Sequence, residues 1–316
     1  MIAQLVITGL LGCVASYFGV SVLRRWAEQK GVLDIPNARS SHVRPTPRGG
    51  GVLIVLVTLI GMLMSQFISP FMSWPVLGVI IFGSGLIAVV SWIDDLRSLP
   101  NRIRFAVHFL AALIGIVAVG YWREVTLPLI GTIYLGWLGL PLTLIWIVGL
   151  TNAYNFMDGI DGIAGSQAVI GGIGWVLLGG LSGQPVVMIL GLLVASSSLG
   201  FLAFNWPPAK IFMGDVGSAF LGYTFALLPL LSASGRLPWS GALLSGFLLV
   251  WPFITDAALT FIRRLLHGEP VFQAHRSHIY QRLVIAGHSH KTVTLLYAGL
   301  SCLGVIAAVT LRLATP

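Results

Sequence analysis

The sequence predicts an all-α, polytopic membrane protein built as a bundle of about ten transmembrane helices. The chain of 316 residues is 56% hydrophobic and only 9% charged, and its mean hydropathy is +0.92. About a quarter of the residues in a soluble globular domain are charged, so the composition excludes that class. The apolar residues gather in long runs, and most Lys and Arg residues lie in alternate gaps between them. We therefore expect a single integral membrane domain covering residues 1–316.

Ten apolar runs are long enough to cross a bilayer as helices, which takes about 17 to 25 residues. The first run is followed, not preceded, by its positive charges, Arg24 and Arg25. A signal peptide has the opposite order, so this run is predicted to remain as a span. The ten predicted spans cover residues 2–23, 51–69, 74–93, 103–121, 137–154, 162–181, 185–204, 216–232, 240–262 and 292–312.

The positive charges predict how these spans are oriented. If the spans alternate in direction, fifteen of the eighteen Lys and Arg residues fall on one side, and Arg123, Arg236 and Arg312 fall on the other. Positively charged loops face the cytoplasm, so both termini are expected to be periplasmic. The predicted cytoplasmic loops comprise residues 24–50, 94–103, 155–161, 205–215 and 263–291.

Five aspartates lie at the cytoplasmic ends of the predicted spans: Asp94, Asp95, Asp158, Asp161 and Asp215. A carboxylate costs about 2.5 to 3.5 kcal/mol at the centre of a membrane helix, so acids near the hydrocarbon indicate function. We expect them to converge on one site, where hard oxygen ligands suit Mg²⁺ or Mn²⁺ better than zinc. Asp256, inside the span 240–262, is a sixth candidate whose role stays open.

Asp94 and Asp95 are adjacent at the carboxyl end of a predicted span, where the helix dipole disfavours negative charge. A metal or a cationic ligand would offset their repulsion, and one of the two would then act as a base. The alternative is a pair of solvated loop acids beside Arg97.

The segment NAYNFMDGIDGIAG places Asn152, Asn155, Asp158 and Asp161 at intervals of three residues. Residues with this spacing share one face of a helix, which predicts a polar stripe at the membrane boundary that binds a cation or a polar ligand. Asp161 would alternatively cap the next span. Further along, Asp215 opens a predicted span in the segment FMGDVGS, where Asp215 or Ser218 would alternatively serve as the cap.

The segment QAHRSHIYQRL places His275, His278 and Arg282 at positions i, i+3 and i+7, on one face of a predicted helix. Because the arginine fork matches phosphate oxygens, we interpret this face as a cationic site for phosphates. A zinc site is the weaker interpretation, since no Cys or acid completes a tetrahedral set. Arg44 and Arg48, in HVRPTPRGGG, offer a second phosphate contact, or simply part of the positive charge of a cytoplasmic loop.

These five segments, HVRPTPRGGG, the Asp94–Asp95 pair, NAYNFMDGIDGIAG, FMGDVGS and HRSHIYQRL, occur in this order in a known family. Over nearly its whole length the chain resembles the polyprenyl-phosphate N-acetylhexosamine-1-phosphate transferases, or glycosyltransferase family 4. The family fold is a bundle of ten or eleven helices with a cytoplasmic active site. The resemblance implies transfer of an N-acetylamino-sugar 1-phosphate from a UDP-sugar, UDP-GlcNAc or a 6-deoxy relative, to undecaprenyl phosphate with release of UMP and with Mg²⁺ as cofactor.

The resemblance also implies roles for single residues. Asp215 matches the metal ligand, and Asp158 would be a second metal contact. Asp94 or Asp95 would deprotonate or position the lipid phosphate, and which of them does so stays open. The nucleotide and the diphosphate would be held by the remaining motif residues, namely Asn152, Asn155, Asp161, Arg44, Arg48, His275, Arg276, His278 and Arg282.

Two departures from the family pattern bear on the substrate. The branch that starts peptidoglycan synthesis carries a Lys in the first loop and three consecutive histidines late in the chain, whereas this chain has Arg44 and Arg48 and the sequence His-Arg-Ser-His. This favours the branch that starts O-antigen or other cell-surface polysaccharides, in the bacterial inner membrane. No nucleic-acid partner is expected. The oligomeric state, a homodimer included, and the choice between single and double displacement stay open.

A cation- or proton-coupled transporter is the alternative from another functional class. Transporters place their ionisable residues near the middle of the bilayer, whereas five aspartates here lie at span ends, and only Asp256 favours transport. The CDP-alcohol phosphotransferases also use intramembrane aspartates, but their sequence pattern is absent from this chain.

Overall fold

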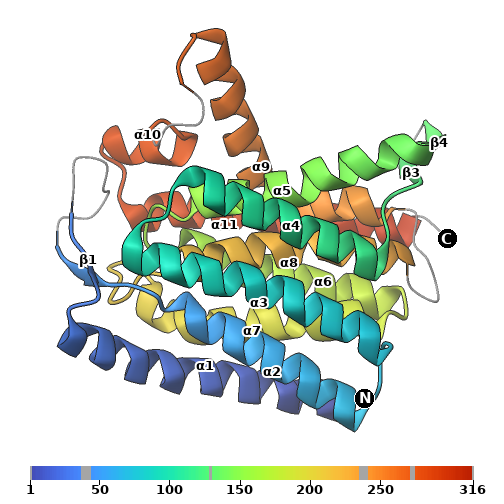
Figure 1. Ribbon diagram of the computed structural model, residues 1–316, viewed down its shortest axis with the longest axis horizontal. Coiled ribbons are helices and arrows are strands. Elements are labelled where there is room, and N and C mark those ends of the chain that lie inside the picture. Colours follow the sequence, from blue (N-terminus) through green and yellow to red (C-terminus); the bar gives the residue numbers. More distant parts are fainter. Residues whose placement is uncertain (1, 37–43, 128–129, 235–240, 271–274, 315–316) are drawn as a thin grey trace.

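The protein is mostly helical (Figure 1). The computed structural model describes residues 2–36, 44–127, 130–234, 241–270 and 275–314. Arg236 and parts of the predicted loops 24–50 and 263–291 lie outside these residues. The helices are α1 (Ile2–Lys30), α2 (Gly51–Ile68), α3 (Trp74–Arg97), α4 (Asn101–Val119), α5 (Gly139–Met157), α6 (Ile163–Leu181), α7 (Pro185–Asn205), α8 (Asp215–Ser234), α9 (Ala242–Leu266), α10 (Ile279–Ile285) and α11 (His290–Ala314), with a short 3₁₀ turn η1 (Gly136–Leu138) before α5.

Ten helices in the described part of the chain are long and apolar enough to cross a membrane, which confirms the predicted number of spans. Each corresponds to one predicted span, with ends that differ by a few residues. The largest differences are at the carboxyl ends of three helices: α1 continues to Lys30, α3 to Arg97 and α9 to Leu266. These helices extend past the apolar runs because the backbone hydrogen bonds continue after the side chains become polar.

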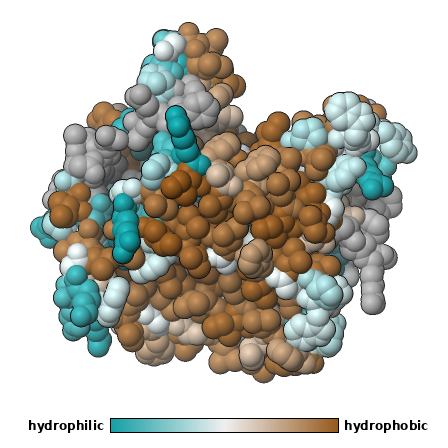
Figure 2. Space-filling model, viewed as in Figure 1, coloured by the Kyte–Doolittle hydropathy of each residue, from teal (hydrophilic) through white to brown (hydrophobic). Residues whose placement is uncertain are grey.

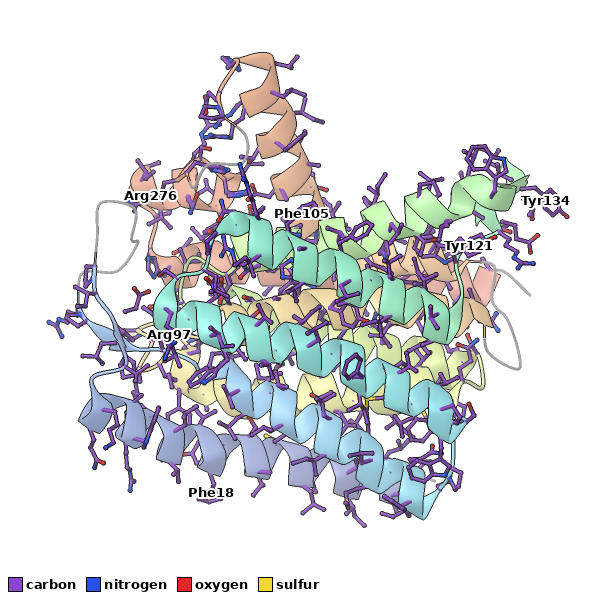
Figure 3. All side chains as sticks on the ribbon, in the orientation of Figure 1. Phe18, Arg97, Phe105, Tyr121, Tyr134 and Arg276 are labelled. Carbon is purple, nitrogen blue, oxygen red and sulfur yellow. The ribbon has the colours of Figure 1, made fainter. Side chains whose placement is uncertain are left out.

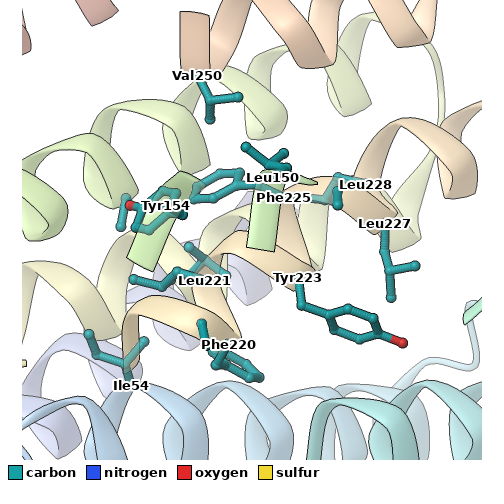
Figure 4. Close-up of a cluster of buried hydrophobic side chains, with 14 of the residues drawn as sticks. Ile54, Leu150, Tyr154, Phe220, Leu221, Tyr223, Phe225, Leu227, Leu228 and Val250 are labelled. Carbon is teal, nitrogen blue, oxygen red and sulfur yellow. The ribbon is translucent and has the colours of Figure 1, made fainter. Parts of the chain in front are cut away.

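Helix α8 forms the centre of the bundle. Of the residues in the apolar stretch of α8, 94% are buried inside the protein. The helix packs against α2, α3, α5 and α9. Figure 4 shows the apolar side chains around it, among them Tyr154 of α5 and Phe225 of α8, whose rings stack with centroids 5.7 Å apart. A helix that is surrounded by other helices in this way has a fixed position, and so do the residues at its amino end.

Four short strands were not predicted. β1 (Leu33–Asp34) pairs antiparallel with β2 (Thr46–Pro47), and β3 (Glu124–Leu127) pairs antiparallel with β4 (Gly131–Tyr134). Each hairpin is too small to add a layer to the fold. They lie at opposite ends of the bundle in Figure 1, and β1 is on the same side as α10.

The two ends of the bundle differ in composition. Figure 3 shows Arg97 and Arg276 at the end that carries α10, and Tyr121 and Tyr134 at the other end. Both chain termini lie toward the aromatic end in Figure 1. Between the two ends, Figure 2 shows a broad hydrophobic surface, as expected for a protein whose sides contact lipid. The functional site is therefore expected at the polar end with α10.

Candidate active site

Asp95, at the end of α3, connects this helix to the amino end of α8. Its Oδ1 accepts a hydrogen bond from the backbone N–H of Asp215 at 2.9 Å, and its Oδ2 accepts one from the N–H of Val216 at 3.1 Å. A carboxylate at a helix amino end satisfies unpaired N–H groups and interacts favourably with the dipole. Asp95 is therefore the cap of α8, and the alternative predictions that Asp215 or Ser218 provides the cap are wrong.

Asp94 is held beside Asp215 by an arginine. Nη1 of Arg104, in α4, donates to Oδ2 of Asp94 at 2.9 Å and to Oδ2 of Asp215 at 3.0 Å. The other oxygen of Asp94 accepts from the backbone N–H of Leu99. Asp94 and Asp95 are both buried, so the alternative of two solvated loop acids beside Arg97 is wrong.

Arg104 is the contact that sequence reasoning missed. At the start of the predicted span 103–121, it contributes in the sequence only to the excess of positive charge on the cytoplasmic side. One signal was present, because a cation in the first turns of a helix opposes the helix dipole, and Arg104 lies three residues after the start of α4. Such a position indicates that another interaction stabilises the charge, here the two carboxylates of Asp94 and Asp215.

Arg48, at the end of the first loop, joins the same cluster. Its Nη1 donates to the backbone oxygen of Asp95 at 3.0 Å, and its Nε lies 3.6 Å from Asp95 Oδ1. Arg44 is exposed, and no contact between it and the acidic residues is seen in the described part of the chain. The structure therefore brings one of the two predicted first-loop arginines to the site.

The segment that begins at Asn152 is helical only in part. Helix α5 ends at Met157, and Asp158 is its C-cap. The predicted polar stripe on one continuous helix is therefore wrong, because residues 158–162 form a turn instead. Asn152 donates its amide to the backbone oxygen of Val148 at 2.7 Å, and Asn155 Oδ1 accepts from the hydroxyl of Ser218 at 2.6 Å.

Asp161 fixes the far side of this turn. Its Oδ2 accepts from the backbone N–H of Ala209 at 3.0 Å, and its Oδ1 lies 3.4 Å from Nδ1 of His290. The N-cap of α6 is Gly162, without a side-chain cap, so the alternative in which Asp161 caps that helix is wrong. Asp161 instead connects the turn to the loop before α8 and to the start of α11.

The carboxylate of Asp158 lies in an electrostatically unfavourable environment. Its removal from water, followed by the negative charges of Asp215 and Asp95, raises the pKa of Asp158 to about 8. Repulsion between carboxylates that are close together has this effect. A cation bound near Asp158 and Asp215 would reverse it.

The late histidine segment does not form the predicted helical face. Helix α10 starts at Ile279, so His275 and His278 precede it, and Arg282 alone lies on it. The two imidazole rings are nevertheless neighbours, with centroids 5.0 Å apart. Arg276 is partly buried and Arg282 is exposed.

The charge of this segment is lower than predicted. Burial, followed by repulsion from His278 and Arg264, lowers the pKa of His275 to about 4. The ring of His275 is therefore neutral at pH 7, and the positive charge that this segment offers to a phosphate comes from its arginines. The segment adjoins the Asp158 turn, because the hydroxyl of Tyr280 donates to the backbone oxygen of Phe156 at 3.0 Å.

The acidic residues suit a hydrated magnesium ion better than a site built from protein ligands alone. Among the described residues, no group of three His, Cys, Asp or Glu side chains could hold a metal ion. Magnesium commonly binds through one or two carboxylates and completes its shell with water and substrate phosphates. Asp215 and Asp158 provide such carboxylates, and the contact of Arg104 with Asp215 shows that a cation is stabilised there. The residues therefore fit the ion.

The sequence of the chain is similar to those of known enzymes. Residues 77–233 match glycosyl transferase family 4. A probable undecaprenyl-phosphate N-acetylglucosaminyl 1-phosphate transferase of Bacillus subtilis is 35% identical over 297 residues, which cover 93% of this chain and 81% of that protein. A decaprenyl-phosphate N-acetylglucosaminephosphotransferase of Mycobacterium tuberculosis is 31% identical over 342 residues, which cover 97% of this chain and 83% of that protein. A phospho-N-acetylmuramoyl-pentapeptide-transferase of a Synechococcus species is 40% identical, but over only 50% of this chain and 48% of that protein.

Proposed function

This chain belongs to glycosyl transferase family 4, and we propose that it transfers an N-acetylamino-sugar 1-phosphate from a UDP-sugar to undecaprenyl phosphate, releasing UMP. UDP-N-acetylglucosamine is the first candidate donor, with a 6-deoxy relative as the second. The relatives that match 86% or more of the chain bear the names of N-acetylglucosamine 1-phosphate transferases. The matches to two phospho-N-acetylmuramoyl-pentapeptide-transferases extend over 50% and 71% of it.

The observation that carries the proposal is the meeting of acids and arginines at one end of the bundle. Asp94, Asp95 and Asp215 come from two helices, and Arg48 and Arg104 from two other segments. Carboxylates that bind a divalent cation, beside arginines that match phosphate oxygens, suit a diphosphate substrate. The broad hydrophobic surface on the face shown in Figure 2 suits a lipid acceptor.

The proposed reaction is a single in-line displacement. An oxygen of the lipid phosphate forms a bond to the sugar-linked phosphorus of the UDP-sugar, and the bond from that phosphorus to the bridging oxygen breaks, so that UMP leaves with the electron pair. Asp94 is the better candidate to position or deprotonate the lipid phosphate, because its Oδ2 is held by the side chain of Arg104, whereas both oxygens of Asp95 accept backbone N–H groups of α8. Arg48 and Arg104 would stabilise charge on the diphosphate.

Asp215 would hold magnesium, and Asp158 would be the second ligand. When bound, the ion supplies positive charge that stabilises the diphosphate and the leaving UMP. Asn152, Asn155 and Asp161 would form the nucleotide side of the site, and His275, Arg276, His278 and Arg282 would lie toward the diphosphate. Manganese would bind to the same oxygen ligands.

The reaction would take place at the cytoplasmic face of the bacterial inner membrane and start O-antigen or another cell-surface polysaccharide. The excess of Lys and Arg at the site end supports this orientation. The transporter alternative rested on Asp256, and this residue accepts hydrogen bonds from α10 and from Tyr297, which leaves no observation in favour of transport.

The test is UMP release by the purified protein. We expect release from UDP-N-acetylglucosamine that depends on both undecaprenyl phosphate and Mg²⁺, with slower release from a panel of other UDP-sugars. Asp215→Asn should reduce the rate about 100- to 1,000-fold, as loss of a major electrostatic contact does. Asp34→Asn, the same change in β1 and outside the site, is the matched control and should keep the rate.

Two results would contradict the proposal. Absence of UMP release with every UDP-sugar would exclude the activity, and full activity of the Asp215→Asn protein would exclude the metal assignment. Exchange of labelled UMP into the UDP-sugar without lipid acceptor would instead show a covalent phospho-aspartate intermediate, and so a double displacement.

A further inference from the structure

Asp256 is a buried carboxylate in the middle of α9 that the proposed mechanism does not use. Only 2% of the residue is exposed, and it lies four residues after Pro252, beyond a kink at Val250. A carboxylate in this position is costly unless its oxygens are satisfied. Figure 1 shows that the part of α9 beyond the kink leaves the bundle toward α10.

The two oxygens of Asp256 accept five hydrogen bonds. Oδ1 accepts from Nδ1 of His278 at 3.1 Å, from the N–H of Ile279 at 2.8 Å and from the hydroxyl of Thr260 at 3.2 Å. Oδ2 accepts from the N–H of Tyr280 at 3.0 Å and from the hydroxyl of Tyr297 at 2.6 Å. Asp256 therefore caps α10, and its oxygens have little capacity left for a transported ion.

The contact with His278 determines which ring nitrogen carries a proton. A carboxylate oxygen is only an acceptor, so Nδ1 of His278 must be the donor in this hydrogen bond. In the neutral ring the proton then lies on Nδ1, and Nε2 is the basic nitrogen. A carboxylate behind a histidine fixes the orientation of the ring and raises the basicity of the far nitrogen.

His278 is also tied to the wall of the proposed site. The next residue but one, Tyr280, donates its hydroxyl to the backbone oxygen of Phe156, two residues before Asp158. A Cβ on Gly159 would lie 2.0 Å from that hydroxyl, so the glycine permits the close approach. The rings of Phe156 and His278 are 6.3 Å apart. The histidine segment and the Asp158 turn thus pack as one unit.

We propose that Asp256 is a positioning residue of the transferase, which accepts the Nδ1 proton of His278 and so fixes the ring with Nε2 toward the donor, where the doubly protonated imidazole would donate its Nε2–H to an oxygen of the diphosphate. Tyr297 supports it by fixing the second carboxylate oxygen. The proposal rests on the proposed function, because a diphosphate is what His278 would contact. Asp256 itself does not touch the substrate and acts through the imidazole.

The first experiment is a double-mutant cycle on UMP release. Asp256→Asn keeps the size of the side chain and removes its charge, and we expect a loss in kcat/KM for the UDP-sugar of about 10- to 100-fold, the usual effect of removing a group that orients a histidine. The KM for undecaprenyl phosphate should stay unchanged. In a His278→Asn background, the same change should cost less than about threefold, because the residue through which Asp256 acts is gone.

The second experiment reads the tautomer without turnover. Histidine labelled with ¹⁵N should show Nδ1 protonated at His278, assigned by loss of the signal in His278→Asn, and a shift of the proton to Nε2 in Asp256→Asn. If the wild-type protein released no UMP, the proposed function would fail while this spectrum would still test the role of Asp256.

A pair of tyrosine variants covers the case in which Asp256→Asn does not fold. Tyr297→Phe removes one donor to Asp256 and should lower kcat/KM for the UDP-sugar about 3- to 10-fold. Tyr223→Phe removes a buried hydroxyl that donates to Ala111, away from the histidine segment, and should leave kcat/KM unchanged. Equal losses in both tyrosine variants, equal effects of Asp256→Asn in the two backgrounds, or an unchanged tautomer would overturn the proposal.

Discussion

The two adjacent aspartates at the end of α3 have different surroundings. Asp95 turns toward the start of α8 and accepts two backbone N–H groups there. Asp94 turns toward α4, where Arg104 joins it to Asp215. Neighbouring residues in a helix point about 100° apart, so a pair of identical residues can serve two neighbouring elements. Asp95 therefore caps α8, and Asp94 pairs with Arg104.

The two ion pairs of Arg104 should contribute to the stability of the protein. Arg104→Gln should lower the free energy of unfolding by about 1 to 3 kcal/mol in the absence of Mg²⁺, because Asp94 and Asp215 lose their counter-charge. The effect is below that of a fully buried pair, since 29% of the Arg104 side chain is exposed. Added Mg²⁺ should restore more stability to this variant than to the wild type. Thermal unfolding in detergent, with and without Mg²⁺, measures both effects.

Arg97→Gln is the matched control for this change. Arg97 ends α3 and is exposed, so its loss should alter stability by no more than about 0.5 kcal/mol. If Arg97→Gln and Arg104→Gln behaved alike, or if Mg²⁺ stabilised the wild type as strongly as Arg104→Gln, the counter-charge role of Arg104 would be wrong.

At the scale of elements, the first loop is held in place by the loop before α8. The backbone N–H of Phe212 donates to the oxygen of Pro47 at 2.8 Å, and the N–H of Gly50 donates back to Phe212 at 2.9 Å. The N–H of Gly51 donates to the oxygen of Met213 at 2.9 Å. These hydrogen bonds place the start of α2 against the start of α8. They also bring Arg48 into contact with Asp95.

The contact between these two helix starts requires a glycine. A Cβ on Gly51 would lie 2.4 Å from Cα of Gly217, which belongs to the backbone of α8 and cannot move aside. Gly51→Ala should therefore destabilise the protein by about 1 to 3 kcal/mol, as overpacking does, and should reduce UMP release by displacing Arg48. Thermal unfolding and the UMP assay check the two effects.

Gly149→Ala separates this steric effect from the general effect of adding a methyl group. Gly149 lies inside α5 with open space at the position of a Cβ, so alanine there should be neutral or stabilise by up to about 1 kcal/mol. Equal stability of the two alanine variants would show that the α2–α8 contact can relax, contrary to the prediction.

At the scale of the whole molecule, the bundle separates the positive and the aromatic ends. Figure 3 shows the arginines at the end with the site and the tyrosines at the other. Tyr134 and Trp137 are 81% and 77% exposed, and such aromatic residues are typical of a membrane interface. Because ten helices among the described residues can cross the membrane, the start of α1 and the end of α11 lie on one side if each of these helices crosses once.

The orientation can be tested by labelling single cysteines. In a protein with Cys13→Ser and Cys302→Ser, we introduce either Lys30→Cys at the site end or Tyr134→Cys at the aromatic end. A maleimide that does not cross membranes should label Tyr134→Cys in intact cells and Lys30→Cys only after the membranes are opened. The opposite pattern would place the site outside the cytoplasm and contradict the proposed function.

The sequence by itself determined the architecture of this protein. Its apolar runs are long enough to cross a bilayer, and positively charged loops alternate between them. Such runs form helices, because the backbone N–H and C=O groups in lipid must be hydrogen-bonded within each segment. The cost of carboxylates near hydrocarbon also identified the acidic residues, and Asp94, Asp95, Asp158 and Asp215 do gather at one end. Local composition was sufficient for these conclusions.

Only the tertiary structure decided what each polar residue contacts. Spacing predicted helical faces through Asp158 and His278, but both segments turn at these residues. The sequence places Arg104 only among the positive charges of the cytoplasmic side, and four of the five hydrogen bonds to Asp256 come from residues 22 to 41 positions along the chain. Such contacts depend on how helices pack, and a polar group in a buried bundle takes the nearest available partner, whatever its distance in sequence.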